Sequence, residues 1–242
     1  MDIHRIPTEK VRDLYNRLEN MWGADHWHAH TKKWLNTYLR KQISLAEKAT
    51  TVLHVGSAGV DYGLVGSMTC HVDVADKKLT GVPNAVIGDI HSLPIKPDSV
   101  DFCTCVGSVL NYCDAVVSLL QVSSVIKAGG HLVLEFETSE SWEYFGSDVY
   151  NLGVTSTHTF YGGDPDCTLW IYSLTFIKEI LLKHGFRVKD ESRSHVLSSL
   201  IYRLTHNEKF STKFASFDHI SGKIPLLRRG ASNVILLCQK SL

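Results

Sequence analysis

The 242-residue sequence lacks an excess of either charge, an apolar run long enough to cross a membrane, and an apolar segment at its N-terminus. Lys and Arg together number 25, as do Asp and Glu, so no overall field attracts a polyanion. The longest nearly apolar runs, such as residues 234–238, fall far short of the roughly 18 residues that span a bilayer. We therefore expect a cytoplasmic protein with no nucleic-acid partner and no membrane contact.

The sequence also lacks the cysteine and histidine spacings of a metal site. None of its six cysteines forms a CxxC pair, and Cys103 and Cys105 stand in an apolar run, where cysteine behaves as a small hydrophobic residue. His26, His28 and His30 would share one side only in an extended chain, because a helix spreads this spacing around its surface. We expect reduced thiols and no bound metal.

A repeating pattern of strands and helices begins at Thr51. Runs rich in β-branched residues alternate with stretches expected to be helical near residues 60–67, 111–127 and 173–184, the last followed by Gly185 as a helix-ending glycine. This alternation predicts βα units and a parallel sheet that is covered on both faces. The expected strands are TVLHVG, TCHVDV, NAVIGD, VDFCTCVGS, HLVLEFE, FRVKDES and NVILLCQ.

A small-residue turn, Gly56-Ser57-Ala58-Gly59, follows the first of these strands. Small residues let the backbone approach a ligand closely, and the N–H groups of a following helix would face that ligand. Asp73 ends the second strand 73 − 56 = 17 residues later, near the offset at which a carboxylate accepts both ribose hydroxyls of a nucleotide-like cofactor. Asp89 and Ile90, after the third strand, suit an adenine amine and ring. A plain tight turn and turn-capping carboxylates are the alternatives.

Five segments between residues 50 and 190 resemble, in order, the motifs of class I S-adenosylmethionine-dependent methyltransferases. These segments are VLHVGSAG, VDVADKKL, GDIHSLPIKPDSVDFCTCVGSVLNY, VIKAGGHLVLEF and SLTFIKEILLKHGFRV. The resemblance implies S-adenosyl-L-methionine as cofactor and a doubly wound, seven-stranded Rossmann-like sheet whose last strand is antiparallel. It also implies that the cofactor is bound by Gly56, Ser57, Ala58, Gly59, Asp73, Val74, Asp89, Ile90, Cys105, Val106 and Gly107.

Three positions depart from the family pattern. His54 stands where an acidic residue is usual, Ala58 where the middle glycine is usual, and Val60 where a third glycine often stands. Val60 would crowd the start of the helix expected there. These departures favour a weaker cofactor site, and they keep open the alternative of a non-catalytic partner subunit.

Methyl transfer from a sulfonium is an in-line displacement, which needs alignment and, for some acceptors, a base. The amino-nucleobase motif of the family is absent, since residues 107–112 read GSVLNY. Glu135 and Glu137 alternate with Phe136 at the carboxyl end of the fifth strand, and one of them must face the site side of the sheet there. We take Glu137, His158 and Tyr161 as the candidate catalytic residues; solvated polar side chains in loops are the alternative.

Helical segments flank the core on both sides. We expect one methyltransferase domain over residues 1–242, with an N-terminal helical lid at 1–48, a cofactor-binding core at 49–194, a helical insertion at 195–230 and a closing strand at 231–242. The predicted function is methyl transfer to a small-molecule acceptor enclosed by the lid. A protein or RNA methyltransferase is the competing hypothesis, and the sequence leaves the acceptor atom and the oligomeric state open.

Overall fold

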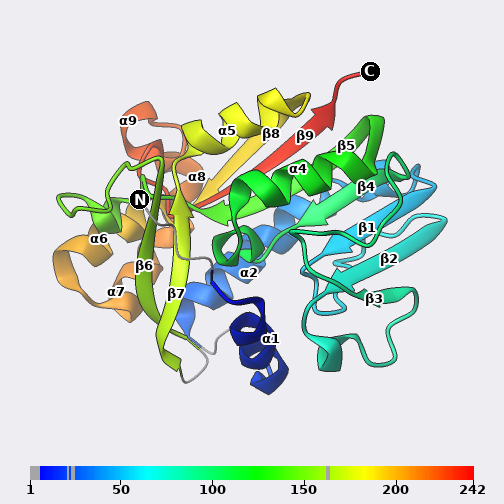
Figure 1. Cartoon of the computed structure of the whole chain (residues 1–242). Helices are drawn as coiled ribbons and strands as arrows, with labels where there is room; N and C mark the ends of the chain where they lie inside the picture. Colours follow the sequence, from blue (N-terminus) through cyan, green and yellow to red (C-terminus); the bar gives the residue numbers. More distant parts are fainter. Residues whose placement is uncertain (1–5, 21, 23–24, 162–163) are drawn as a thin grey trace.

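Seven strands form one mixed sheet at the centre of the molecule (Figure 1). The strands are β1 (Thr51–Val55), β2 (Met68–Asp73), β3 (Ala85–Ile87), β4 (Val100–Cys105), β5 (Ile126–Glu137), β8 (Phe186–Ser194) and β9 (Asn233–Lys240). Their spatial order is β3-β2-β1-β4-β5-β9-β8. The first five strands pair in parallel, whereas β9 is antiparallel to both β5 and β8. The predicted doubly wound α/β fold with an antiparallel last strand is confirmed.

The computed structural model describes residues 6–20, 22, 25–161 and 164–242, with the backbone alone described at 159–161 and 164–166. Within this part of the chain, no helix has the length and apolarity needed to span a bilayer. The described residues contain no disulfide bond, and five of the six cysteines are buried.

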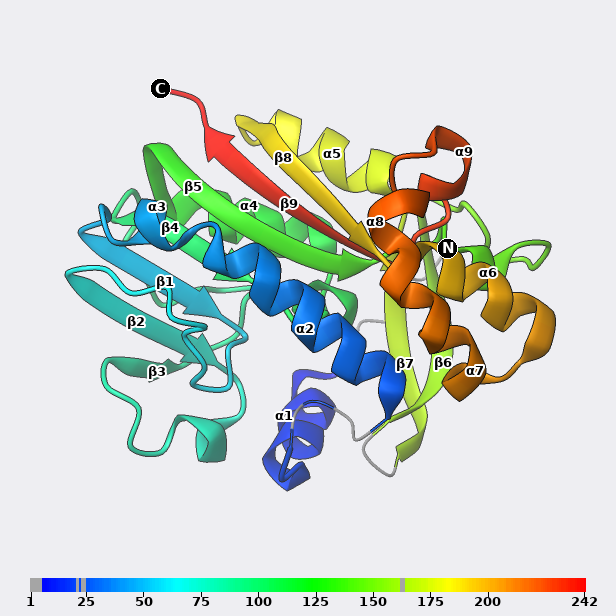
Figure 2. The same cartoon turned by 180° about the vertical axis from the view of Figure 1, so that it is seen from behind.

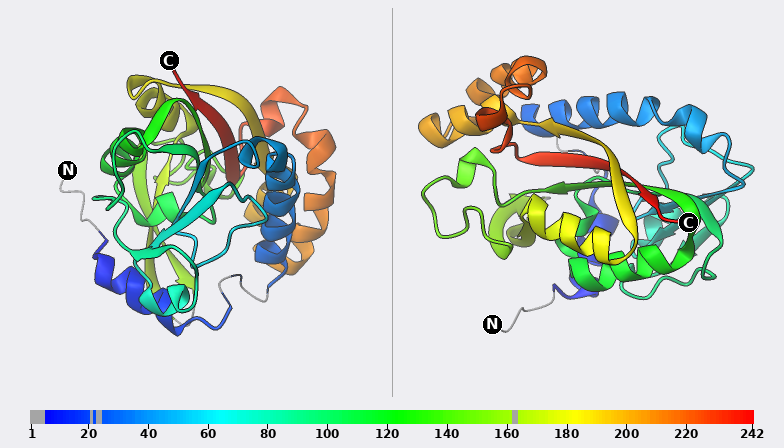
Figure 3. Two further views of the ribbon diagram at one scale, coloured as in Figure 1. Left: turned by 90° about the vertical axis from the view of Figure 1, so that its right-hand side faces the viewer. Right: turned by 90° about the horizontal axis from the view of Figure 1, so that it is seen from above.

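Helices cover both faces of the sheet, so the molecule has three layers (Figures 2 and 3). On one face lie α4 (Ala115–Val125) and α5 (Leu174–Lys183); on the other lie α2 (His26–Arg40) and the short α3 (Ile43–Ala46). Because neighbouring strand residues point to opposite faces, Leu53 of β1 joins the first apolar cluster. Val52 joins the second, together with residues of α2.

The ends of the core helices follow from local chemistry. Asp114 caps α4, since its side chain accepts from the backbone N–H groups of Val116 and Val117. Ser173 caps α5 in the same way, and Gly185 just beyond its end has a φ of +81°. The helix and the terminating glycine predicted at 173–185 are therefore both confirmed.

The helix predicted at residues 60–67 is wrong, because the chain between β1 and β2 forms a series of turns. Positive φ angles at Ala58 (+45°) and Tyr62 (+56°), as well as at three glycines of this segment, are incompatible with a helix. The place against the sheet is taken by Leu35 and Leu39 of α2, which are fully buried. Val60 therefore does not crowd a helix start, and the departure at that position loses its expected effect.

A two-stranded antiparallel hairpin, β6 (Val154–Tyr161) and β7 (Asp164–Tyr172), was not predicted from the sequence. Its segments TSTHTFY and CTLWIY are rich in β-branched and aromatic residues, which is typical of strands. Leu169 and Tyr172 pack into the core cluster under α4 and α5, so the hairpin is anchored at the edge of the sheet where the strands end.

Shorter helices and 3-10 turns complete the described structure. They are α1 (Thr8–Arg17), α6 (Val196–Thr205), α7 (Glu208–Thr212), α8 (Asp218–Ser221) and α9 (Pro225–Arg228), with 3-10 turns η1 (Asp76–Leu79), η2 (Val109–Tyr112), η3 (Trp142–Tyr144) and η4 (Lys213–Phe217). The two flanks meet directly, since the ring of Trp27 stacks on that of His195 at 3.8 Å between centroids.

Candidate active site

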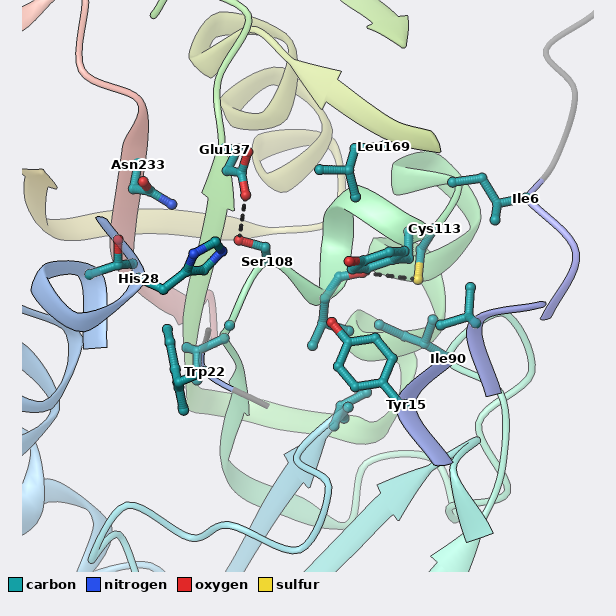
Figure 4. Close-up of a pocket in the computed structure, with 18 of the residues that line it drawn as sticks. Ile6, Tyr15, Trp22, His28, Ile90, Ser108, Cys113, Glu137, Leu169 and Asn233 are labelled. Carbon is teal, nitrogen blue, oxygen red and sulfur yellow. Dashed lines mark hydrogen bonds between the residues drawn. The ribbon is translucent and has the colours of Figure 1, made fainter. Parts of the chain in front are cut away.

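A cavity of about 820 Å³ lies at the carboxyl ends of the parallel strands, between the sheet and the two helical flanks. Its floor is formed by the residues that follow β1, β2, β3 and β4, and its walls come from α1, the start of α2, the β6–β7 hairpin, α6 and α7. Figure 4 shows Tyr15 and Ile90 toward one end, with His28, Glu137 and Asn233 toward the other. The cavity therefore has two distinct ends.

The structure brings eight of the eleven expected cofactor residues to this cavity. Those that line it are Gly56, Ser57, Asp73, Val74, Asp89, Ile90, Val106 and Gly107. The other three lie elsewhere: Ala58 lines a neighbouring cleft, Gly59 packs toward Val82, and Cys105 is buried in the core under α4 and α5.

Gly56 makes the tight turn after β1 with a φ of +65°. A Cβ atom there would lie 2.5 Å from both methyl carbons of Val109, so the loop after β1 touches the loop after β4. Ala58 keeps a left-handed conformation where the family usually has glycine. Its backbone N–H donates to Asp73 Oδ2 at 2.7 Å, and Ala75 N–H donates to Asp73 Oδ1 at 2.8 Å. Asp73 thus fixes the turn and also faces the cavity.

We expect Gly56→Ala to lower the free energy of unfolding by about 2 to 5 kcal/mol, because it adds left-handed strain and a clash with Val109. The Val109→Ala substitution removes the clashing methyl groups. The double variant should therefore regain the part of the unfolding free energy that the clash costs, but not the part due to backbone strain. Urea unfolding of the two single variants and the double variant measures this difference. If the two single losses of unfolding free energy simply added in the double variant, the steric contact between residue 56 and Val109 would be contradicted.

His54, which stands where the family usually has an acidic residue, has a structural explanation. The ring is fully buried, with Nε2 donating to the carbonyl of Leu64 at 3.0 Å and Nδ1 bonded to Thr104 Oγ1 at 2.7 Å. Burial, together with the neighbouring His71, lowers the pKa of His54 to about 4. His54 is therefore a neutral link between β4 and the turns that replace the expected helix.

The neutral His54 is expected to reduce stability as the pH falls from about 6.5 to about 4. In this window the unfolded chain binds a proton that the folded chain does not, so stability is lost on acidification, by about 3 kcal/mol in total. Urea unfolding of the wild type and of His54→Gln across this range isolates the contribution, since other titrating groups are common to both. Identical pH dependence in the two proteins would argue against a depressed pKa at His54.

Asp89, at the other expected cofactor position, is bonded to α1. It accepts from Thr8 Oγ1 at 2.7 Å, from the His91 backbone N–H at 2.9 Å, and pairs with His91 Nδ1 at 2.6 Å. Burial opposes ionisation of this carboxyl, but the hydrogen bonds more than offset it, so its pKa lies below the ordinary value. The N-terminal helix therefore closes the end of the cavity that contains Asp89 and Ile90.

Glu135 supports the floor of the cavity instead of facing it. Its Oε2 accepts from the backbone N–H groups of Gly107 and Ser108 at 2.8 and 2.7 Å, and its Oε1 accepts from Asn233 Nδ2 at 2.9 Å. The side chain is fully buried, which raises its pKa against the effect of these bonds. Of the two glutamates, Glu137 is the one that lines the cavity.

Glu137 lines the cavity and accepts from Ser108 Oγ at 3.0 Å. Burial and the nearby Glu143 raise its pKa to about 7. His158, on β6, also lines the cavity, with its Nδ1 3.3 Å from Thr168 Oγ1. The side chain of Tyr161 lies outside the described residues.

The sequence analysis did not identify two polar groups that line the cavity at its Glu137 end. The first group is the pair Glu143 and Tyr144, on η3. Burial raises the pKa of Glu143 to about 7. The other is His28, whose Nδ1 lies 2.7 Å from Oδ2 of Asp25, the residue that caps α2. Because α2 begins at His26, the three histidines are spread around a helix, and the described residues contain no cluster able to hold a metal ion. The sequence signal that could have identified His28 is an aspartate three residues before a histidine, at the expected start of a helix.

Comparisons with known proteins agree with this geometry. Residues 59–134 match the family described as a methyltransferase domain, and a search of curated proteins found no match. Among solved structures, an S-adenosylmethionine-dependent methyltransferase of Mesorhizobium loti is 14% identical with a TM-score of 0.60, over 84% of this chain and 96% of that one. The [4+2]-cyclase SpnF is 14% identical with a TM-score of 0.61, over 98% of each chain.

A third similar structure is a Burkholderia thailandensis 1,6-didemethyltoxoflavin N1-methyltransferase with bound 1,6-didemethyltoxoflavin and S-adenosylhomocysteine. It is 10% identical with a TM-score of 0.56, over all of this chain and 94% of that one. At such identities these likenesses concern the fold, and the cyclase illustrates that one fold hosts more than one reaction. The methyltransferase-domain match covers residues 59–134, and the chain as a whole shares the fold of S-adenosylmethionine-dependent methyltransferases.

Proposed function

We propose that this protein transfers the methyl group of S-adenosylmethionine to a small molecule held inside the cavity. The observation that carries the proposal is that one cavity is lined both by eight of the expected cofactor residues and by Glu137. Its volume, about 820 Å³, is toward the upper end of the roughly 300 to 1,000 Å³ typical of ligand pockets. Both helical flanks contribute walls, which favours an enclosed acceptor over a polymer.

The residues present fit the cofactor. Asp73 is a nearly buried carboxylate at the cavity wall, suited to accept from ribose hydroxyls, and Ile90 supplies an apolar surface for an adenine ring. The turn at Gly56 brings the backbone close to the cavity without a side chain in the way. When bound, S-adenosylmethionine supplies an electrophilic methyl group.

The protein's own contribution is positioning and exclusion of water. The floor at Gly107 and Ser108 is held by Glu135, so it presents a fixed surface between the two ends of the cavity. The walls from α1 and from the start of α2 cover the site, which strengthens electrostatic interactions inside it. The Burkholderia neighbour, which binds a small molecule together with S-adenosylhomocysteine, supports the same arrangement by analogy.

Methyl incorporation from labelled S-adenosylmethionine tests the proposal. A cell extract separated into small molecules, protein and RNA is offered to the enzyme, after calorimetry has established binding of S-adenosylhomocysteine. We expect label in the small-molecule fraction. Label confined to protein or RNA would support the competing hypothesis, and failure to bind the cofactor would support the non-catalytic partner subunit.

A further inference from the structure

The cavity is lined by acidic side chains without a permanent cation. Among the described lining residues no Lys or Arg occurs, whereas six carry carboxyl groups: Asp25, Asp73, Asp89, Glu137, Glu143 and Glu208. Asp73 and Asp89 belong to the cofactor end. The remaining four surround the acceptor end, so an anionic acceptor such as a carboxylate or a phosphate ester would meet repulsion on several sides.

Glu137 and Glu143 form the centre of this acidic wall. The Glu137 carboxylate accepts a hydrogen bond from Ser108 Oγ, and the side chain of Tyr144 is hydrogen-bonded to Glu143. Two carboxyls on one cavity wall destabilise each other when both are ionised, and Glu143 contributes, after burial, to the raised pKa of Glu137. A bound ammonium ion would offset that repulsion and replace the missing cation.

His28 supplies a base beside the same wall. Asp25 accepts from the backbone N–H of His28 at 2.8 Å and from its Nδ1 at 2.7 Å, so the helix start and the ring orientation are fixed by one carboxylate. Figure 4 shows the imidazole near Glu137 and Ser108. With Nδ1–H directed to Asp25, the basic lone pair of the imidazole is on Nε2.

Building on the proposed function, we propose that the methyl acceptor is an amine that enters as its ammonium ion, is bound by Glu137 and Glu143, and is deprotonated by His28. The ammonium proton moves to Nε2 of His28, which frees the nitrogen lone pair. The nitrogen then forms a bond to the methyl carbon while the electron pair of the broken S–C bond stays on sulfur. The product is an N-methylammonium ion, which again carries the charge that the acidic wall binds. Asp25 acts as a positioning residue for His28.

Binding to the protein saturated with S-adenosylhomocysteine tests the substrate class. The probes are primary amines from ethylamine to tryptamine, each with the alcohol and the carboxylate of the same skeleton, and thermal shift and calorimetry are the readouts. We expect amines alone to bind. Glu137→Gln and Glu143→Gln should each weaken amine binding at least about tenfold, the loss of one charge-assisted bond. Glu179→Gln, the same change on the exposed face of α5, should leave it unchanged.

The outcomes separate this inference from the proposed function. Saturation with S-adenosylhomocysteine is measured first, and its absence would count against the proposed function itself. If the cofactor binds but no amine does, or if the carboxylates bind better than the amines, the acceptor class is overturned and the proposed function stands.

The role of His28 is tested on the amine that binds best. Loss of a general base in His28→Gln should lower kcat about 100-fold while amine binding is retained. Asp25→Asn keeps a helix cap but removes the carboxylate that orients Nδ1–H of His28, so kcat should fall while amine binding is retained. His219→Gln, on the exposed surface, serves as the control. Wild-type turnover in His28→Gln would overturn its role.

Discussion

Replacing Asp73 by alanine is expected to weaken S-adenosylhomocysteine binding by about 10²- to 10⁴-fold. Two charge-assisted hydrogen bonds to the ribose, each worth about 1.5 to 3 kcal/mol, would be lost. The variant also removes the acceptor for Ala58 N–H and Ala75 N–H, so the turn after β1 loses its support at the same time. Calorimetry on the folded variant measures the effect.

Asp76→Ala provides a matched control three residues away. That carboxylate is exposed and accepts from Asn16 Nδ2, outside the cavity. Its removal should leave cofactor affinity unchanged. A folded Asp73→Ala protein that binds as tightly as the wild type would refute the ribose assignment.

Glu135→Leu is expected to lower the free energy of unfolding by about 3 to 6 kcal/mol. Leucine fills the space without a charge, but the N–H groups of Gly107 and Ser108 and the amide of Asn233 would lose a buried acceptor, at about 1 to 3 kcal/mol each. Because the same groups hold the cavity floor, cofactor affinity should fall as well. Urea unfolding and calorimetry measure the two effects.

Glu135→Gln keeps one acceptor oxygen and should lose less stability than Glu135→Leu. Glu179→Leu, at an exposed position, controls for the change of residue type. If Glu135→Leu lost no more unfolding free energy than Glu179→Leu, the hydrogen bonds from Gly107, Ser108 and Asn233 to Glu135 would not stabilise the fold. The role of Glu135 in supporting the cavity floor would then be refuted.

The positions of the core strands along the chain could be predicted from the sequence because strands and caps are local signals. Strands buried on both faces leave near-continuous apolar runs, and the cap at Ser173 and the glycine at 185 mark one helix without reference to the rest of the chain. The helix expected at 60–67 could not be corrected locally, since what replaces it is α2, a segment far away in the sequence.

The candidate site likewise contains residues that the sequence could identify and residues that it could not. Positions at strand ends, such as Asp73 and Glu137, could be assigned because the fold brings all carboxyl ends of parallel strands to one edge. His28, Glu143 and Thr8 reach the cavity from the flanks and η3, and only tertiary packing places them there.

The predicted roles of the site residues and the boundary between residues 48 and 49 stay predictions. A truncation at that boundary would remove Leu35 and Leu39 from the core, so a shorter deletion that ends before α2 is the better test of a lid.

The position of α2 over the sheet also has a consequence for how the chain matures during synthesis. Leu35 and Tyr38, near the start of the chain, share one cluster with Ile235, near its end, and Trp34 Nε1 donates to Ser192 Oγ at 3.1 Å. Contacts of such large sequence separation form late in folding. A nascent chain therefore cannot complete this cluster until β9 has left the ribosome, and the apolar side of α2 stays uncovered until then.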